Sequence, residues 1–143
     1  MNLSLSVYRR MLFIHAAIFA AVALVLTIGV IEPVKVEASI GATKAIAVKA
    51  FWVNIGLNFL SAVVLVLIAI RFKSQIWNAT PVHAVVGIVA ILLGLSLVDA
   101  ASAYQTHGPS MQTASTLLFF CAAADFLAGV LLVMTAFFQP KNV

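Results

Sequence analysis

The sequence predicts an all-α membrane protein whose four transmembrane helices form an up-down bundle. Hydrophobic residues make up 64% of the 143 residues and charged residues only 8%, whereas soluble domains are about half apolar and a quarter charged. The apolar residues also gather into four runs, each close to the roughly 20 residues that a spanning helix needs. We therefore expect one multi-pass domain over residues 1–143, surrounded by the lipid bilayer.

The first two runs are Met11 to Ile31 and Ala50 to Ile70. Both are expected to be helical, because an isolated strand cannot satisfy its backbone groups in lipid. Pro33 is expected either to end the first span or to kink its last turn. Arg71 ends the second span, and the segment from Glu32 to Lys49 forms the longest predicted connection.

The third and fourth runs are Val82 to Ala103 and, approximately, Thr113 to Phe138. Pro81 suits the first turn of a helix, where the missing N–H is not needed. The Gly108-Pro109-Ser110 stretch predicts the turn between these spans. Short connections favour antiparallel neighbours, as in an up-down bundle.

The distribution of basic residues predicts the orientation. Because the spans alternate direction, the termini and the second connection share one side of the membrane. That side carries Arg9, Arg10, Arg71, Lys73 and Lys141, and the other side carries Lys35, Lys44 and Lys49. Lys and Arg are more frequent in cytoplasmic loops. The sequence therefore predicts that both termini are cytoplasmic.

Asp125 is the most informative polar residue, because it falls near the middle of the fourth span. Its helical stripe consists of small residues, which mark close helix packing: Ala114, Cys121, Ala122, Ala128, Gly129 and Ala136. Asp125 is therefore expected to face another helix. Two interpretations remain open: a carboxylate that binds a proton or cation, and a neutral acid that donates a hydrogen bond between helices.

Asn54, Asn58 and Ser61 share one stripe of the second span, at i, i+4 and i+7, and are expected to point into the bundle. Asp99 lies about one turn from the end of the third span, flanked by Ser96 and Ser102. By depth, Asn54, Asn58, Asp99 and Asp125 could line one polar pocket open to the outer side. Interhelical hydrogen bonding of the asparagines and hydration of Asp99 are the competing interpretations.

His15 and His83 lie near matching ends of the first and third spans, which run in the same direction. Two histidines at similar depth on parallel helices could ligate haem b, or lie beside a quinone. His83 shares its stripe with Gly87 and Gly94, which suits helix packing. His15 shares its stripe with Phe19, Val22 and Leu26, bulky side chains that suit a lipid-facing surface.

Several functional classes have no support in the sequence. Cys121 is the single cysteine, so an intrachain disulfide and a CxxC site are excluded, and no metal-ligand motif is present. Glycine-rich nucleotide loops, HExxH and serine-nucleophile motifs are absent, which favours a non-enzymatic role. The formal charge of +4 comes from residues at the ends of spans, which explains it without nucleic-acid binding.

Three functions remain open. The leading hypothesis is a non-catalytic subunit or interaction protein of a larger membrane assembly, which binds other membrane chains or copies of itself. It is favoured by short extramembrane segments and by alanine stripes such as Ala16-Ala20-Ala23 and Ala17-Ala21. The alternatives are a small oligomeric transporter or channel that uses the pocket around Asp125, and a haem- or quinone-binding redox anchor.

Overall fold

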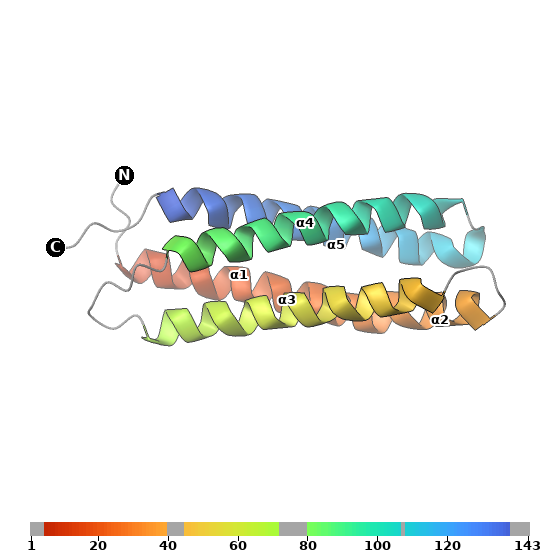
Figure 1. Cartoon of the computed structure of the whole chain (residues 1–143), viewed down its shortest axis with the longest axis horizontal. Helices are drawn as coiled ribbons and strands as arrows, with labels where there is room; N and C mark the ends of the chain where they lie inside the picture. The colour runs from red at the N-terminus through yellow and green to blue at the C-terminus, as the bar shows by residue number, and fades with distance from the viewer. Residues whose placement is uncertain (1–4, 40–44, 72–79, 107, 138–143) are drawn as a thin grey trace.

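A computed structural model describes residues 5–39, 45–71, 80–106 and 108–137 (Figure 1). The elements are α1 (Leu5–Val25), a π-helical turn η1 (Leu26–Val30), α2 (Ile31–Ser39), α3 (Ala45–Arg71), α4 (Thr80–Gln105) and α5 (Pro109–Phe137). Four helical segments are long and apolar enough to span a bilayer: Ser6–Val36, Val48–Arg71, Val82–Gln105 and Met111–Phe137. The predicted four-helix membrane bundle is confirmed. Among the described residues no strand occurs.

The first span is longer than the sequence predicted, because the helix continues through Pro33. Pro33 has no N–H to donate to the carbonyl of Gly29, four residues earlier. The chain accommodates this loss with a wider turn in which the Ile31 N–H donates to the carbonyl of Leu26. The proline therefore distorts the helix and does not end it. The predicted connection from Glu32 to Lys49 is correspondingly shorter, since α2 runs to Ser39 and α3 begins at Ala45.

The four spans form two closely packed antiparallel pairs. α1 packs along α3, and α4 packs along α5 (Figure 1). α1 also contacts α5, which joins the two pairs, whereas α3 and α4 make few contacts with each other. The seam between α3 and α4 is therefore the most loosely packed side of the bundle. We call the end of the bundle where α1 begins and α5 ends the terminal end.

Glycines bring α4 and α5 to backbone contact. A Cβ atom added to Gly129 would lie 2.6 Å from the carbonyl oxygen of Gly87, and one added to Gly94 would lie 2.9 Å from that of Ala122. The predicted small stripe of α5 is buried along its whole length. At the joining turn Gly108 has a φ of +100°, a conformation that favours glycine, and Pro109 opens α5. The sequence-based assignment of these faces is confirmed.

Two apolar cores fill the bundle, one toward each end. The core nearer the terminal end includes Leu12, Phe19 and Leu65, and the other includes Leu26, Leu97 and Leu118. The expectation that the His15 stripe faces lipid is wrong, because Phe19 and Leu26 are fully buried and His15 and Val22 nearly so. These bulky side chains fill the space between the pairs, where the small residues of α5 leave room.

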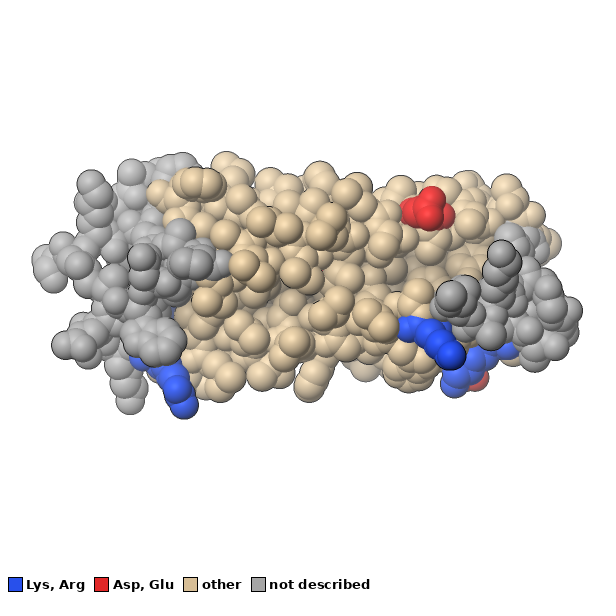
Figure 2. All heavy atoms as spheres, viewed as in Figure 1, with Lys and Arg blue, Asp and Glu red and all other residues tan. Residues whose placement is uncertain are grey.

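The outer surface matches a lipid environment. Large apolar side chains are exposed on every span, among them Ile14 on α1, Phe59 on α3, Leu92 on α4 and Phe120 on α5. On the face shown in Figure 2, the Lys and Arg side chains lie toward the two ends of the long axis, and the surface between them is almost free of charge. The protein is a multi-pass integral membrane protein. The cytoplasmic placement of its termini stays a prediction.

Candidate functional site

Asn54, Asn58 and Asp125 form one buried group between the two apolar cores, which we call the Asn–Asp cluster. Asn58 and Asp125 are fully buried, and Asn54 is 4% exposed. Asn58 Nδ2 lies 3.1 Å from Asp125 Oδ2 and 2.9 Å from Asn54 Oδ1. Asn54 and Asn58 are one helical turn apart on α3, so their side chains meet. The same Asn58 amide group also contacts Asp125 on α5. The structure thus brings together three of the four residues predicted to share a polar pocket.

Asp99, the fourth residue, does not join the cluster. Its side chain is exposed on α4, which agrees with the interpretation of a solvated or headgroup-level acid more than with a pocket residue. Its neighbour Ser96 takes part instead. Asn54 Nδ2 donates to Ser96 Oγ at 3.4 Å, and Ser96 Oγ donates to the carbonyl of Leu93 at 2.7 Å. The cluster is closed, whereas the sequence suggested a pocket open to the outer side.

Two oxygen atoms of the Asn–Asp cluster remain without hydrogen bonds. Asn58 Oδ1 and Asp125 Oδ1 are buried and have no partner among the described residues. Buried polar atoms are hydrogen-bonded in the great majority of cases, so each exception points to a ligand, a water molecule or a functional role. In hydrocarbon a carboxyl group is costly, by about 2.5–3.5 kcal/mol at a helix centre on insertion scales. The Asn–Asp cluster, with a buried carboxyl group and two unpaired oxygens, is therefore the strongest candidate for a functional site in the bundle.

The histidines lie toward the terminal end. His83 is fully buried, and the Tyr8 hydroxyl lies 2.9 and 3.0 Å from its two ring nitrogens. His15 is 4% exposed, and its Nδ1–H donates to the carbonyl of Met11 at 2.7 Å. His15 Nε2 is buried without a partner among the described residues. Tyr8 was not predicted from the sequence, because its position beside two arginines is typical of an interfacial tyrosine.

Bis-histidine haem ligation needs a nitrogen of each ring directed at one iron. The Tyr8 hydroxyl is within hydrogen-bond distance of both nitrogens of His83 and can bond to one of them at a time. Haem or quinone binding at His15 and His83 stays a prediction. No cluster of three or more His, Cys, Asp or Glu side chains suited to a metal occurs in the described part of the chain.

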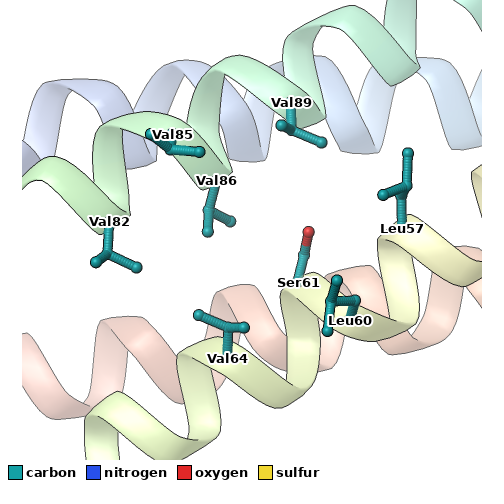
Figure 3. Close-up of a pocket in the computed structure, with 8 residues that line it drawn as sticks. All are labelled: Leu57, Leu60, Ser61, Val64, Val82, Val85, Val86 and Val89. Carbon is teal, nitrogen blue, oxygen red and sulfur yellow. The ribbon is translucent and has the colours of Figure 1, made fainter.

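A groove marks the seam between α3 and α4. It has a volume of about 390 Å³ and is lined by Leu57, Leu60, Ser61, Val64, Val82, Val85, Val86 and Val89 (Figure 3). Leu60 and Val85 are more than half exposed, at 55% and 60%, so the groove opens sideways from the bundle. The Ser61 hydroxyl points from α3 toward α4 (Figure 3). This groove is apolar apart from Ser61, and sequence reasoning did not foresee it.

Three polar contacts join the two helix pairs. Asn54 to Ser96 joins α3 to α4, Asn58 to Asp125 joins α3 to α5, and Tyr8 to His83 joins α1 to α4. Each of these bonds connects one helix pair to the other. Polar contacts thus help to hold the two pairs together, and one of them, Asn54 to Ser96, lies on the loosely packed α3–α4 side.

Comparisons with known proteins give no relative to set beside these features. No protein-family model matches the chain, and no curated protein or solved structure matches it significantly. The geometry of the groove and of the Asn–Asp cluster must therefore support the functional argument by itself.

Proposed function

We propose that this protein is a non-catalytic subunit of a larger membrane assembly, and that the α3–α4 groove receives a transmembrane helix of a partner chain. The observation that supports this proposal is the spacing of the groove lining. Leu57, Leu60, Ser61 and Val64 fall at i, i+3, i+4 and i+7 on α3, and Val82, Val85, Val86 and Val89 repeat that spacing on α4. Both walls therefore present the same register over two turns.

This register is the one that helices use when they pack side by side. Side chains at i, i+3, i+4 and i+7 form the holes into which the side chains of a neighbouring helix insert. Two turns correspond to about 10 Å of helix, enough for a few inserted side chains. Without a water-driven hydrophobic effect between helices in lipid, such packing and nearby hydrogen bonds supply the affinity. The Ser61 hydroxyl offers the groove one polar contact.

A second surface fits the same role. Of the predicted alanine stripes, Ala16 and Ala23 are buried in the bundle, but Ala17, Ala20 and Ala21 remain exposed on α1. Small exposed residues allow another helix to approach closely. By contrast, Ala128 and Gly129 are already used within the chain, so the small face of α5 is not available to a partner.

The test fills the groove and leaves the rest of the bundle unchanged. Val85→Trp places a large side chain in the groove, and Ile88→Trp places the same side chain on an equally lipid-facing position of α4 that does not line it. The protein is extracted gently from its own membrane and measured by native mass spectrometry. We expect a complex of fixed stoichiometry that Val85→Trp dissociates and Ile88→Trp preserves.

Site-specific crosslinking identifies the occupant. A photo-crosslinking amino acid replaces Val85 in one variant and Ile88 in the other. The proposal requires a crosslink from position 85 to one partner chain, the same chain that the intact complex contains. Crosslinks from position 85 to a second copy of this chain, or to lipid alone, would contradict it, as would a complex that tolerates Val85→Trp.

A small transporter or channel is the second candidate, and the buried carboxyl group of Asp125 favours it. Ionisable residues inside spans commonly mark ion or proton pathways. In liposomes, a transporter of this kind loses cation or proton flux with Asp125→Asn and keeps it with Asp99→Asn, because only Asp125 belongs to the Asn–Asp cluster. Flux that is equal in the two variants would remove this candidate.

A further inference from the structure

The unpaired atoms of the Asn–Asp cluster are both electron-pair donors. The two N–H groups of the Asn58 amide are directed at three acceptors: Asp125 Oδ2, Asn54 Oδ1 and the Asn54 carbonyl oxygen. Its own Oδ1 and the second carboxylate oxygen of Asp125 are left unpaired and buried among the described residues. These two oxygens belong to groups in direct contact with each other. One bound species that accepts electron pairs could therefore satisfy both.

The donor set points to a metal cation. Carboxylate and amide oxygens are hard ligands, which suit alkali and alkaline-earth cations more than transition metals. Asn54 Oδ1 is a third oxygen of the same kind beside them. A proton shared between Asp125 Oδ1 and Asn58 Oδ1 is the competing occupant, and the salt dependence measured below distinguishes it from a metal cation.

Charge selects between monovalent and divalent cations. The one ion pair among the described residues is Lys35 with Glu32, so no described lysine or arginine neutralises Asp125. An uncompensated charge is costly in hydrocarbon. A monovalent cation makes the site neutral, whereas a divalent cation leaves a net positive charge between the two apolar cores. We propose that Asn54, Asn58 and Asp125 bind a monovalent metal cation within the membrane.

A chain of polar side chains leads to this site from the surface. Ser96 is exposed on α4 and contacts Asn54, Asn54 contacts Asn58, and Asn58 contacts Asp125. The first of these contacts crosses the loosely packed α3–α4 seam. Small movements of that seam would let a cation exchange one oxygen ligand for the next. The site does not depend on the partner helix proposed above.

Direct binding to the full chain is the first test. The protein is placed in nanodiscs of zwitterionic lipid, and ²²Na⁺ binding is measured with choline chloride holding the ionic strength constant. We expect saturable binding that unlabelled NaCl displaces, that Asp125→Asn abolishes, and that Asp99→Asn leaves intact. Asp99 is the matched control because it is a span carboxyl group outside the cluster. Binding that survives Asp125→Asn overturns the proposal.

Thermal unfolding gives a second readout that does not depend on an acidic variant folding. A ligand that binds the native state alone raises the midpoint of unfolding as its concentration increases. The unaltered protein should unfold at a higher temperature in NaCl, LiCl or KCl than in choline chloride of equal concentration. Asn54→Ala, which removes one oxygen and keeps the carboxyl group, should reduce this shift and weaken ²²Na⁺ binding.

Three results would contradict the proposal. Equal midpoints in all four salts together with no saturable ²²Na⁺ binding would mean that water or a carboxyl proton serves the two oxygens. Displacement of ²²Na⁺ by micromolar Ca²⁺ would contradict the charge argument. Full binding in Asn54→Ala and Asn58→Ala would place the cation elsewhere. Binding without transmembrane flux would keep the site and remove the transporter candidate.

Discussion

Asn58 donates a hydrogen bond to Asp125 across the interior of the bundle, with 3.1 Å between Nδ2 and Oδ2, although the two residues lie 67 positions apart. The bond connects α3 of one helix pair to α5 of the other. It lies between the two apolar cores, where neither side chain is exposed. Loss of this hydrogen bond should therefore lower the stability of the whole bundle and not only of one helix end.

The first prediction concerns the strength of that bond. Asn58→Ala and Asp125→Ala should each destabilise the bundle, and the double variant should lose less than the sum of the two. We expect a coupling energy of about 0.5–2 kcal/mol, the range found for polar pairs in membrane proteins. Reversible unfolding in mixed micelles measures the four free energies. Strict additivity would show that the two groups do not interact.

The second prediction concerns the contact between α4 and α5. A Cβ at Gly129 would meet the Gly87 carbonyl oxygen at 2.6 Å, and backbone cannot move aside as a flexible side chain can. Gly129→Ala should cost about 1–3 kcal/mol of unfolding free energy, as overpacking does elsewhere. Gly56 supplies the control, because a Cβ there meets nothing within 4 Å. Gly56→Ala should be neutral or stabilising by up to about 1 kcal/mol, and a loss similar to that of Gly129→Ala would contradict the packing argument.

The third prediction separates two adjacent arginines. Arg9 Nε donates at 2.9 Å to the carbonyl of Ala69, in the last turn of α3, whereas Arg10 is exposed. The last carbonyls of a helix have no partner within the helix, so a side-chain donor stabilises them. Arg9→Met should lower the unfolding free energy by about 0.5–1.5 kcal/mol. Arg10→Met removes the same charge and should leave stability unchanged; similar losses in both would indicate a general charge effect.

The fourth prediction concerns the contact of α1 with α4. Tyr8→Phe keeps the aromatic ring but removes the hydroxyl that reaches His83. The buried His83 imidazole then lacks this hydrogen bond, which should lower the unfolding free energy by about 1–3 kcal/mol. Ser102→Ala is a suitable control, since among the described residues that exposed hydroxyl bonds within α4 alone, to the Val98 carbonyl at 2.9 Å. Hydrogen exchange at the start of α4 should increase in Tyr8→Phe alone, and unchanged exchange there would contradict a stabilising bond.

Part of the candidate site could be read from the sequence. The spacing of Asn54 and Asn58 placed both on one face of α3, and the small residues around Asp125 placed it against another helix. These are properties of single helices, because the 3.6-residue period fixes which side chains share a face. Tyr8 and Ser96 escaped prediction because their partners, His83 and Asn54, lie on other helices.

Composition and periodicity by themselves determined that this chain spans the bilayer four times and which face of α5 packs closely, since burial in lipid and close approach of helices restrict residue types within each helix. Only the tertiary structure decided that Asp99 stays outside the Asn–Asp cluster, that Phe19 and Leu26 turn inward, and that a groove separates α3 from α4. These outcomes depend on the rotation and spacing of one helix relative to another. In lipid every apolar face is acceptable on the outside, so hydrophobicity cannot select that rotation; side-chain shape and a few polar contacts do.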